Sequence, residues 1–185
     1  MKTGLLRSVA AAFIATGLIM AGRVGVDLWN VQHQDDQQSK AWQTFVGAAA
    51  GADASSANPD LYLKLTIPKL GKDAIAANGN WDSLKKVSMV HYKDSPAPGQ
   101  KGNVLVAFHR ETHWLDINTI GAGDAIVIQT ADGRVFHYKI DFVQTVPPAQ
   151  VDLLKPTSGN DLTLITCDPV WQDYNRMYFR AHLTA

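Results

Sequence analysis

The strongest constraint on the fold is a series of β-type segments, separated by turn residues, that occupies the chain from Leu61 onward. Most of them are too short for an ordinary helix, and they are rich in branched and aromatic residues that favour strands. The segments expected to be strands are 61–67, 103–108, 125–130, 134–146, 161–166 and 176–183. No long amphipathic helix interrupts them, so the pattern predicts a small, mainly β barrel.

A hairpin and several helical turns are expected within this region. Asp132-Gly133 separates two apolar runs, and an Asp-Gly pair in that position is a strong hairpin signal. Because strand side chains alternate between two faces, the second run should place four residues on one face: Phe136, Tyr138, Ile140 and Phe142. Single helical turns are expected at 81–86, 114–120 and 149–154.

The N-terminal region has the pattern of an export signal. Lys2 and Arg7 precede an apolar run that extends to Gly22. The run is short for a membrane-spanning helix of about 20 residues but long for the apolar part of a cleaved signal peptide, so both interpretations stay open. We favour an uncleaved single-pass anchor at residues 1–23 in the cell membrane. The positive charges before the run then place the rest of the chain outside the cell.

Residues 24–60 are expected to form a stalk and linker, and residues 61–185 the folded domain. Apolar residues recur at helical spacing in 24–46, whereas 47–59 is rich in Ala, Gly and Ser and is typical of a flexible linker. A chain of 185 residues has room for one ordinary domain and a tail. Lys and Arg equal Asp and Glu at 17 each, so no net positive charge favours a nucleic-acid partner.

Cys167 is the only cysteine in the chain, so an internal disulfide is impossible even in an oxidising compartment. A lone cysteine is either a small buried packing residue or a nucleophile. Cys167 ends an apolar strand just before Asp168-Pro169, and a strand end combines a fixed backbone with an open face. A thiol attacks only as a thiolate, so a cation or hydrogen-bond donor must lie nearby.

His109 is the best candidate for that partner because it also ends an apolar strand, 104–108, and two strand ends can meet at one rim of a barrel. His113, in the following loop, is an alternative. The remaining histidines of the domain fall in or beside strands and are interpreted as surface or packing residues: His91, His137 and His182.

Arg176 begins the last strand and is the third candidate. A guanidinium held near a reacting carbonyl donates hydrogen bonds to the negative oxygen of a tetrahedral intermediate. Period-two alternation places Arg176 and Arg180 on the same face. Arg180 is interpreted as a solvated strand arginine.

Metal and nucleotide chemistry have no matching motif. The sequence contains no Cys-x-x-Cys, no His-Glu-x-x-His and no Gly-rich phosphate loop. Asp116, Asp168 and Asp173 are able to bind calcium or to orient a histidine, but they lack the spacing of an oxygen-ligand site. We therefore expect no metal ion and no cofactor.

Four segments of the domain resemble those of the sortase family, in the family's order: Ile67–Gly71, Pro98–Val104, Thr163–Cys167 and Arg176–Phe179. The resemblance covers 63–183. One departure is Phe108, where sortases usually carry Gly before the histidine, and its ring is expected to reshape the rim. His109–His113 and Cys167–Pro169 are more similar to class D and E sortases than to class A.

The resemblance implies a closed eight-stranded barrel and a transpeptidation. Cys167 would attack the Thr carbonyl of an LPXTG-like sorting signal, His109 would protonate the leaving amine, and Arg176 would hold the substrate and the oxyanion. Phe108, Arg110 and Thr166 are the candidate substrate-binding residues. The implied partners are surface proteins with a C-terminal sorting signal and an amine acceptor from a peptidoglycan precursor or a pilin.

Two other functions remain compatible with the sequence. A secreted cysteine peptidase would use the same residues but transfer the acyl group to water. A non-catalytic barrel would bind a partner through its rim, with Cys167 as a packing residue.

Overall fold

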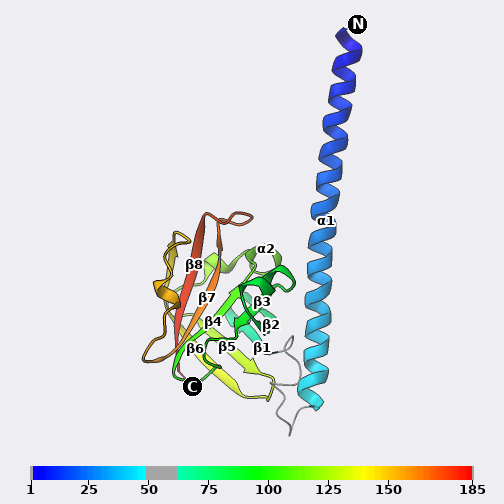
Figure 1. Ribbon diagram of the computed structural model, residues 1–185. Coiled ribbons are helices and arrows are strands. Elements are labelled where there is room, and N and C mark those ends of the chain that lie inside the picture. Colours follow the sequence, from blue (N-terminus) through cyan, green and yellow to red (C-terminus); the bar gives the residue numbers. More distant parts are fainter. Residues whose placement is uncertain (1, 49–61, 185) are drawn as a thin grey trace. The chain divides into compact units, whose positions relative to one another are not determined.

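The computed structural model describes residues 2–48 and 62–184 (Figure 1). The chain divides into two compact units, Met1–Gln34 and Asp35–Ala185, which are described separately. A helix, α1, extends over Lys2–Ala48. By hydropathy, none of the helices in the described part of the chain is long and apolar enough to cross a membrane. Most of the predicted linker, 49–59, lies outside the described residues.

Eight strands form a closed barrel in the order β1-β2-β3-β4-β7-β8-β6-β5, as expected for a mainly β domain (Figure 1). The strands are β1 Leu63–Ile67, β2 Lys72–Gly79, β3 Met89–Tyr92, β4 Gly102–Phe108, β5 Ala125–Thr130, β6 Val135–Val146, β7 Asn160–Asp168 and β8 Asn175–Leu183. The short helices between them are η3 Pro68–Leu70, η4 Trp81–Lys85, α2 Arg110–His113, η5 Ile117–Thr119 and η6 Asp152–Leu154.

The core fills the inside of the barrel and is set by strand alternation. In β1, the alternate residues Leu63, Leu65 and Ile67 are fully buried. All seven residues of β4 are buried, because this strand runs in parallel beside β7 and is covered on both faces. β4 and the central residues of β7 are therefore well packed, which suits these strands to support groups placed at their ends.

The predicted hairpin is confirmed: β5 and β6 pair in antiparallel fashion around Gly133, which has a positive φ of 86°. The expectation that Phe142 shares a face with Tyr138 and Ile140 is wrong. The register of β6 against β8 shifts between Ile140 and Phe142, which reverses the alternation. Phe142 is 40% exposed, and Val143 packs against the core in its place.

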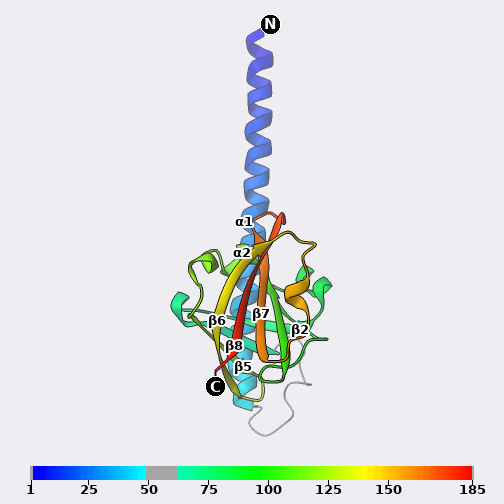
Figure 2. The same cartoon turned by 90° about the vertical axis from the view of Figure 1, so that its left-hand side faces the viewer.

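The strands β6, β8 and β7 lie side by side on one wall of the barrel (Figure 2). Between β6 and β7 the chain leaves the sheet for residues 147–159, which include η6. This segment returns beside the ends of β4 and β7, where the candidate site lies.

Candidate active site

The three predicted catalytic residues come from neighbouring strand ends. β4 and β7 are parallel and pair up to Ala107 and Ile165, so His109, directly after β4, and Cys167, near the end of β7, lie at the same edge. β8 runs antiparallel to β7 and places Arg176 directly opposite Cys167. The topology therefore brings His109, Cys167 and Arg176 to one rim, as the sequence indicated.

These three side chains line a single cleft of about 370 Å³. Most of the other lining residues are apolar and come from η4, the strand ends and the β6–β7 segment: Trp81, Leu84, Ala107, Phe108, Pro148, Val151, Leu154, Ile165, Thr166 and Tyr178. A polar reacting group is thus set in an apolar groove, which suits an extended peptide with apolar side chains.

His109 is held by an acceptor at each ring nitrogen. Its Nε2 lies 2.7 Å from the carbonyl oxygen of Leu84, and its Nδ1 lies 3.4 Å from a carboxylate oxygen of Glu111. Because both oxygens can only accept, the arrangement favours the doubly protonated imidazolium. The bond to Glu111 is the main cause that raises the pKa of His109 above its usual value, against the opposing effect of burial. His109 is thereby suited to act as an acid.

Cys167 is partly buried and is a free thiol. Burial raises its pKa above the ordinary value, while the positive charge of Arg176 acts in the opposite direction. The carboxylates of Glu111 and Asp173 raise it further. At neutral pH the thiol form therefore predominates, and a thiolate facing an imidazolium is a minor population.

Arg176 is anchored by its own turn. Its Nη1 donates to the carbonyl oxygens of Asp173 and Asn175, each at 3.0 Å. A guanidinium has five N–H donors in a rigid plane, so anchoring through one nitrogen fixes the direction of the others. Since Arg176 faces Cys167 across the strand pair, these donors suit an oxyanion that forms beside the sulfur.

Of the three predicted substrate-binding residues, two line the cleft and one does not. Phe108 and Thr166 both line the cleft, although little of either is exposed. The Thr166 hydroxyl donates to the Phe108 carbonyl oxygen at 2.9 Å, and the Phe108 ring packs at a tilt on Trp114. Arg110 is not among the residues that line the cleft; its side chain is only 6% exposed and is paired with Asp168.

The pair of Arg110 and Asp168 ties together the residues that follow His109 and Cys167. Arg110 Nη1 donates to Asp168 Oδ1 at 2.7 Å. On the other side of His109 and Cys167, Thr166 is bonded to the Phe108 carbonyl. His109 and Cys167 therefore lie between two cross-links that join the ends of β4 and β7, which limits how far they can move apart.

The other histidines of the barrel do not line this cleft. His91 is buried, with its ring nitrogens near Asn78, Ser95 and Pro96, and burial lowers its pKa. His182 pairs with Asp141 at 2.6 Å on the surface. Their interpretation as packing and surface residues agrees with these positions.

The roles of two carboxylates at the site were not predicted from the sequence. Glu111 bonds His109, and Asp168 bonds Arg110. Glu111 lies two residues after His109, which is the one local signal that could have suggested it. The partner of Asp168 is distant in sequence, so only the fold reveals it. Among the described residues, no group of three or more His, Cys, Asp or Glu is placed to hold a metal ion.

Comparison with known proteins agrees with this geometry. A family model described as "Sortase domain" matches residues 65–184. Sortase SrtE1 of Streptomyces coelicolor is 32% identical over 92% of the chain, and the chain spans 55% of that relative's length.

Solved sortase structures have the same fold. Sortase E of Streptomyces avermitilis superposes with a TM-score of 0.59 at 30% identity, covering 69% of this chain and 90% of its own. The Clostridium perfringens sortase D5 transpeptidase gives 0.63 at 22% identity, covering 84% and 99%. Sortases of classes D and E are thus among the similar proteins, whereas the predicted preference for these classes over class A stays a prediction. The chain belongs to the sortase family.

Proposed function

We propose that the protein is a cysteine transpeptidase that cleaves an LPXTG-like sorting signal and transfers the acyl part to an amine. The observation that carries this proposal is the cleft in which the only cysteine of the chain lies beside His109 and directly opposite Arg176. A nucleophile, a proton donor and an oxyanion-stabilising cation are the groups that acyl transfer requires.

In the first half-reaction, the Cys167 thiolate attacks the Thr carbonyl of the sorting signal, and Arg176 stabilises the resulting oxyanion. As the C–N bond breaks, the imidazolium of His109 gives its proton to the leaving amine. The product is a thioester on Cys167. The raised pKa of His109 supports its role as the acid in this step.

In the second half-reaction, an incoming amine attacks the thioester and His109 accepts the proton that the amine loses. The C–S bond breaks, and Cys167 leaves as thiolate while the new amide forms. The raised pKa of Cys167 implies that only a minor part of the enzyme holds thiolate and imidazolium together, and the raised pKa of His109 enlarges that part.

The substrates that fit this chemistry are surface proteins with a C-terminal sorting signal. The apolar walls of the cleft suit the Leu and Pro of such a signal. The acceptor would be an amine of a peptidoglycan precursor or a pilin subunit, which the family resemblance supports. We also propose that no metal or other cofactor takes part.

We further propose that residues 1–23 anchor the protein in the cell membrane with the barrel outside. Lys2 and Arg7 before the apolar run support this orientation. The test is to express the full chain in cells. The protein should sediment with membranes after a high-salt wash, and protease added to intact cells should digest the barrel. Release of the protein into the medium would indicate cleavage instead, and recovery from the cytosol would contradict export.

The transferase function is tested by incubating the purified full chain with a sorting-signal peptide and triglycine. We expect mass spectrometry to show the cleaved peptide joined to triglycine, with no such product from Cys167→Ala. Hydrolysis alone with every amine tried would identify a peptidase. Unchanged product in the Cys167→Ala variant would contradict the assignment of the nucleophile.

A further inference from the structure

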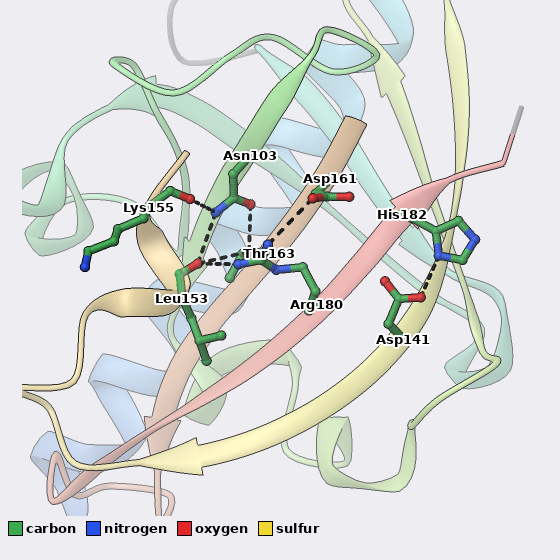
Figure 3. Close-up of polar contacts among 8 residues, drawn as sticks. All are labelled: Asn103, Asp141, Leu153, Lys155, Asp161, Thr163, Arg180 and His182. Atoms are coloured by element: carbon green, nitrogen blue, oxygen red, sulfur yellow. Dashed lines mark hydrogen bonds and ion pairs between the residues drawn. The ribbon is translucent and has the colours of Figure 1, made fainter. Parts of the chain in front are cut away.

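Backbone carbonyls hold the wall of the cleft formed by the β6–β7 segment to the barrel, and the carbonyl of Leu153 accepts the shortest of these bonds. Residues 147–159 contain three cleft-lining residues, Pro148, Val151 and Leu154. Leu153, in η6, lies between the last two, and its carbonyl oxygen points back towards β4, β7 and β8 (Figure 3). Because Leu153 lies between them in the chain, the position of its carbonyl constrains where Val151 and Leu154 lie in the cleft.

Donors from two strands make close hydrogen bonds with the Leu153 carbonyl, and the Thr163 hydroxyl on β7 lies farther from it, at 3.5 Å. Arg180 on β8 donates through Nη2 at 2.6 Å, and Asn103 on β4 donates through Nδ2 at 3.0 Å (Figure 3). The same Asn103 amide also donates to the Lys155 carbonyl at 3.2 Å. The segment is thus fixed at the carbonyls of Leu153 and Lys155, which flank Leu154.

The donors are themselves fixed. The Thr163 hydroxyl on β7 donates to Asn103 Oδ1 at 2.7 Å, which orients the amide group so that its nitrogen faces the segment. Asn103 is 2% exposed and Thr163 is fully buried, so water competes little for these bonds.

Arg180 differs from its interpretation as a solvated strand arginine. Its side chain is only 12% exposed, and its Nη1 lies 3.7 Å from a carboxylate oxygen of Asp161. That distance is long for a hydrogen bond, whereas the bond to Leu153 is short. The guanidinium is therefore bonded more closely to the β6–β7 segment than to its own barrel wall.

We propose that Arg180, with Asn103, is a positioning residue that fixes the β6–β7 wall before substrate binds. Without this anchor, residues 147–159 would have to be ordered at the expense of binding energy whenever a substrate enters. The chemistry at Cys167 would be unchanged, because neither residue lines the cleft. The effect on catalysis rests on the proposed function, whereas the effect on the segment's order does not.

The test compares Arg180→Met with two matched variants of the full chain. Asp161→Asn removes the carboxylate beside Arg180 but leaves the donor to Leu153. Arg134→Met removes an arginine that is 65% exposed and remote from the segment's anchor. Arg180→Lys keeps one donor at this position and is the conservative variant. It also provides the comparison with the parent if Arg180→Met folds poorly.

The first readout is hydrogen exchange at the amides of Gln150, Leu154 and Lys155, whose bonds lie within the segment. Arg180→Met should accelerate their exchange about tenfold, with Arg180→Lys intermediate and the other two variants unchanged. The second readout is kinetic: Arg180→Met should raise KM for the sorting peptide about tenfold with kcat within about twofold of the parent.

Unchanged exchange in Arg180→Met, or the same increase in Asp161→Asn, would overturn the proposal. So would a fall in kcat at constant KM. If the parent protein transfers no acyl group, the proposed function fails, yet the exchange measurement still decides whether Arg180 holds the segment.

Discussion

Removing the Asp168 carboxylate is expected to destabilise the barrel and to impair catalysis, although Asp168 does not itself line the cleft. The carboxylate accepts a 2.7 Å bond from Arg110, whose side chain is 6% exposed. In Asp168→Ala the guanidinium would stay buried without its counter-charge. The link between the residues after His109 and Cys167 would be lost as well.

The magnitude follows from the unequal burial of the partners. Removing one member of a buried ion pair decreases the free energy of unfolding by about 3 kcal/mol when the other charge remains buried. Arg110→Met leaves Asp168, which is 26% exposed and can be hydrated. This variant should therefore decrease the free energy of unfolding by only about 1 kcal/mol. The double variant leaves no buried charge, so its free energy of unfolding should resemble that of Arg110→Met. The coupling energy between Arg110 and Asp168 should then be about 3 kcal/mol.

The assay is urea unfolding of the four proteins, followed by near-ultraviolet circular dichroism. The kinetic counterpart is transfer of a sorting peptide to triglycine, in which Asp168→Ala should decrease kcat more than it raises KM, because the reacting groups lose alignment. Equal destabilisation by Asp168→Ala and Arg110→Met, or additive effects in the double variant, would show that Arg110 does not depend on Asp168 for its counter-charge.

Further predictions concern the site and the fold. Glu111→Gln should lower the pKa of His109, so the acidic limb of the kcat/KM profile should move to lower pH. Its plateau should fall by up to about tenfold, because less imidazolium coexists with thiolate; an unmoved limb would contradict this role. Alkylation of Cys167 by iodoacetamide, followed by intact mass, should be slow at neutral pH and accelerate above the ordinary thiol range, since burial raises its pKa; fast modification at neutral pH would argue against that shift. Gly99→Ala should decrease the free energy of unfolding by about 2 kcal/mol, because φ is +82° and a Cβ would overlap the Phe136 ring; full stability in a melt would count against it. Transfer should persist in excess chelator, since the sequence offers no calcium-ligand spacing, and loss of activity restored by calcium would show otherwise.

The parts of the fold that could be predicted are those with a strong local pattern. The apolar run before His109 and the Asp132-Gly133 turn correspond to β4 and the β5–β6 hairpin. β2 and β3 were not predicted, because β2 is rich in Ala with few branched or aromatic residues and β3, with four residues, is too short to show a pattern. The bulge after Ile140 has no sequence signature, and it exposed Phe142.

The candidate site could likewise be predicted only in part from the sequence. His109, Cys167 and Arg176 could be proposed because each lies at a strand end, and strand ends of one barrel meet at a rim. The partners of Arg110 and Arg180 could not, because Asp168 and Leu153 are far away in sequence and become neighbours only through the pairing of β4, β7 and β8. The sequence does not distinguish a buried arginine from a solvated one, because the acceptor that pairs with the buried side chain comes from a distant segment.

The thioester intermediate is tested most directly by mass spectrometry of the full chain mixed with a sorting-signal peptide in the absence of an added amine. We predict a mass increase equal to the acyl part of the peptide, located on Cys167 by fragmentation and removed when triglycine is added, with formation of the joined peptide. Transfer without any adduct on Cys167, or an adduct that an amine does not resolve, would contradict a thioester mechanism at this cysteine.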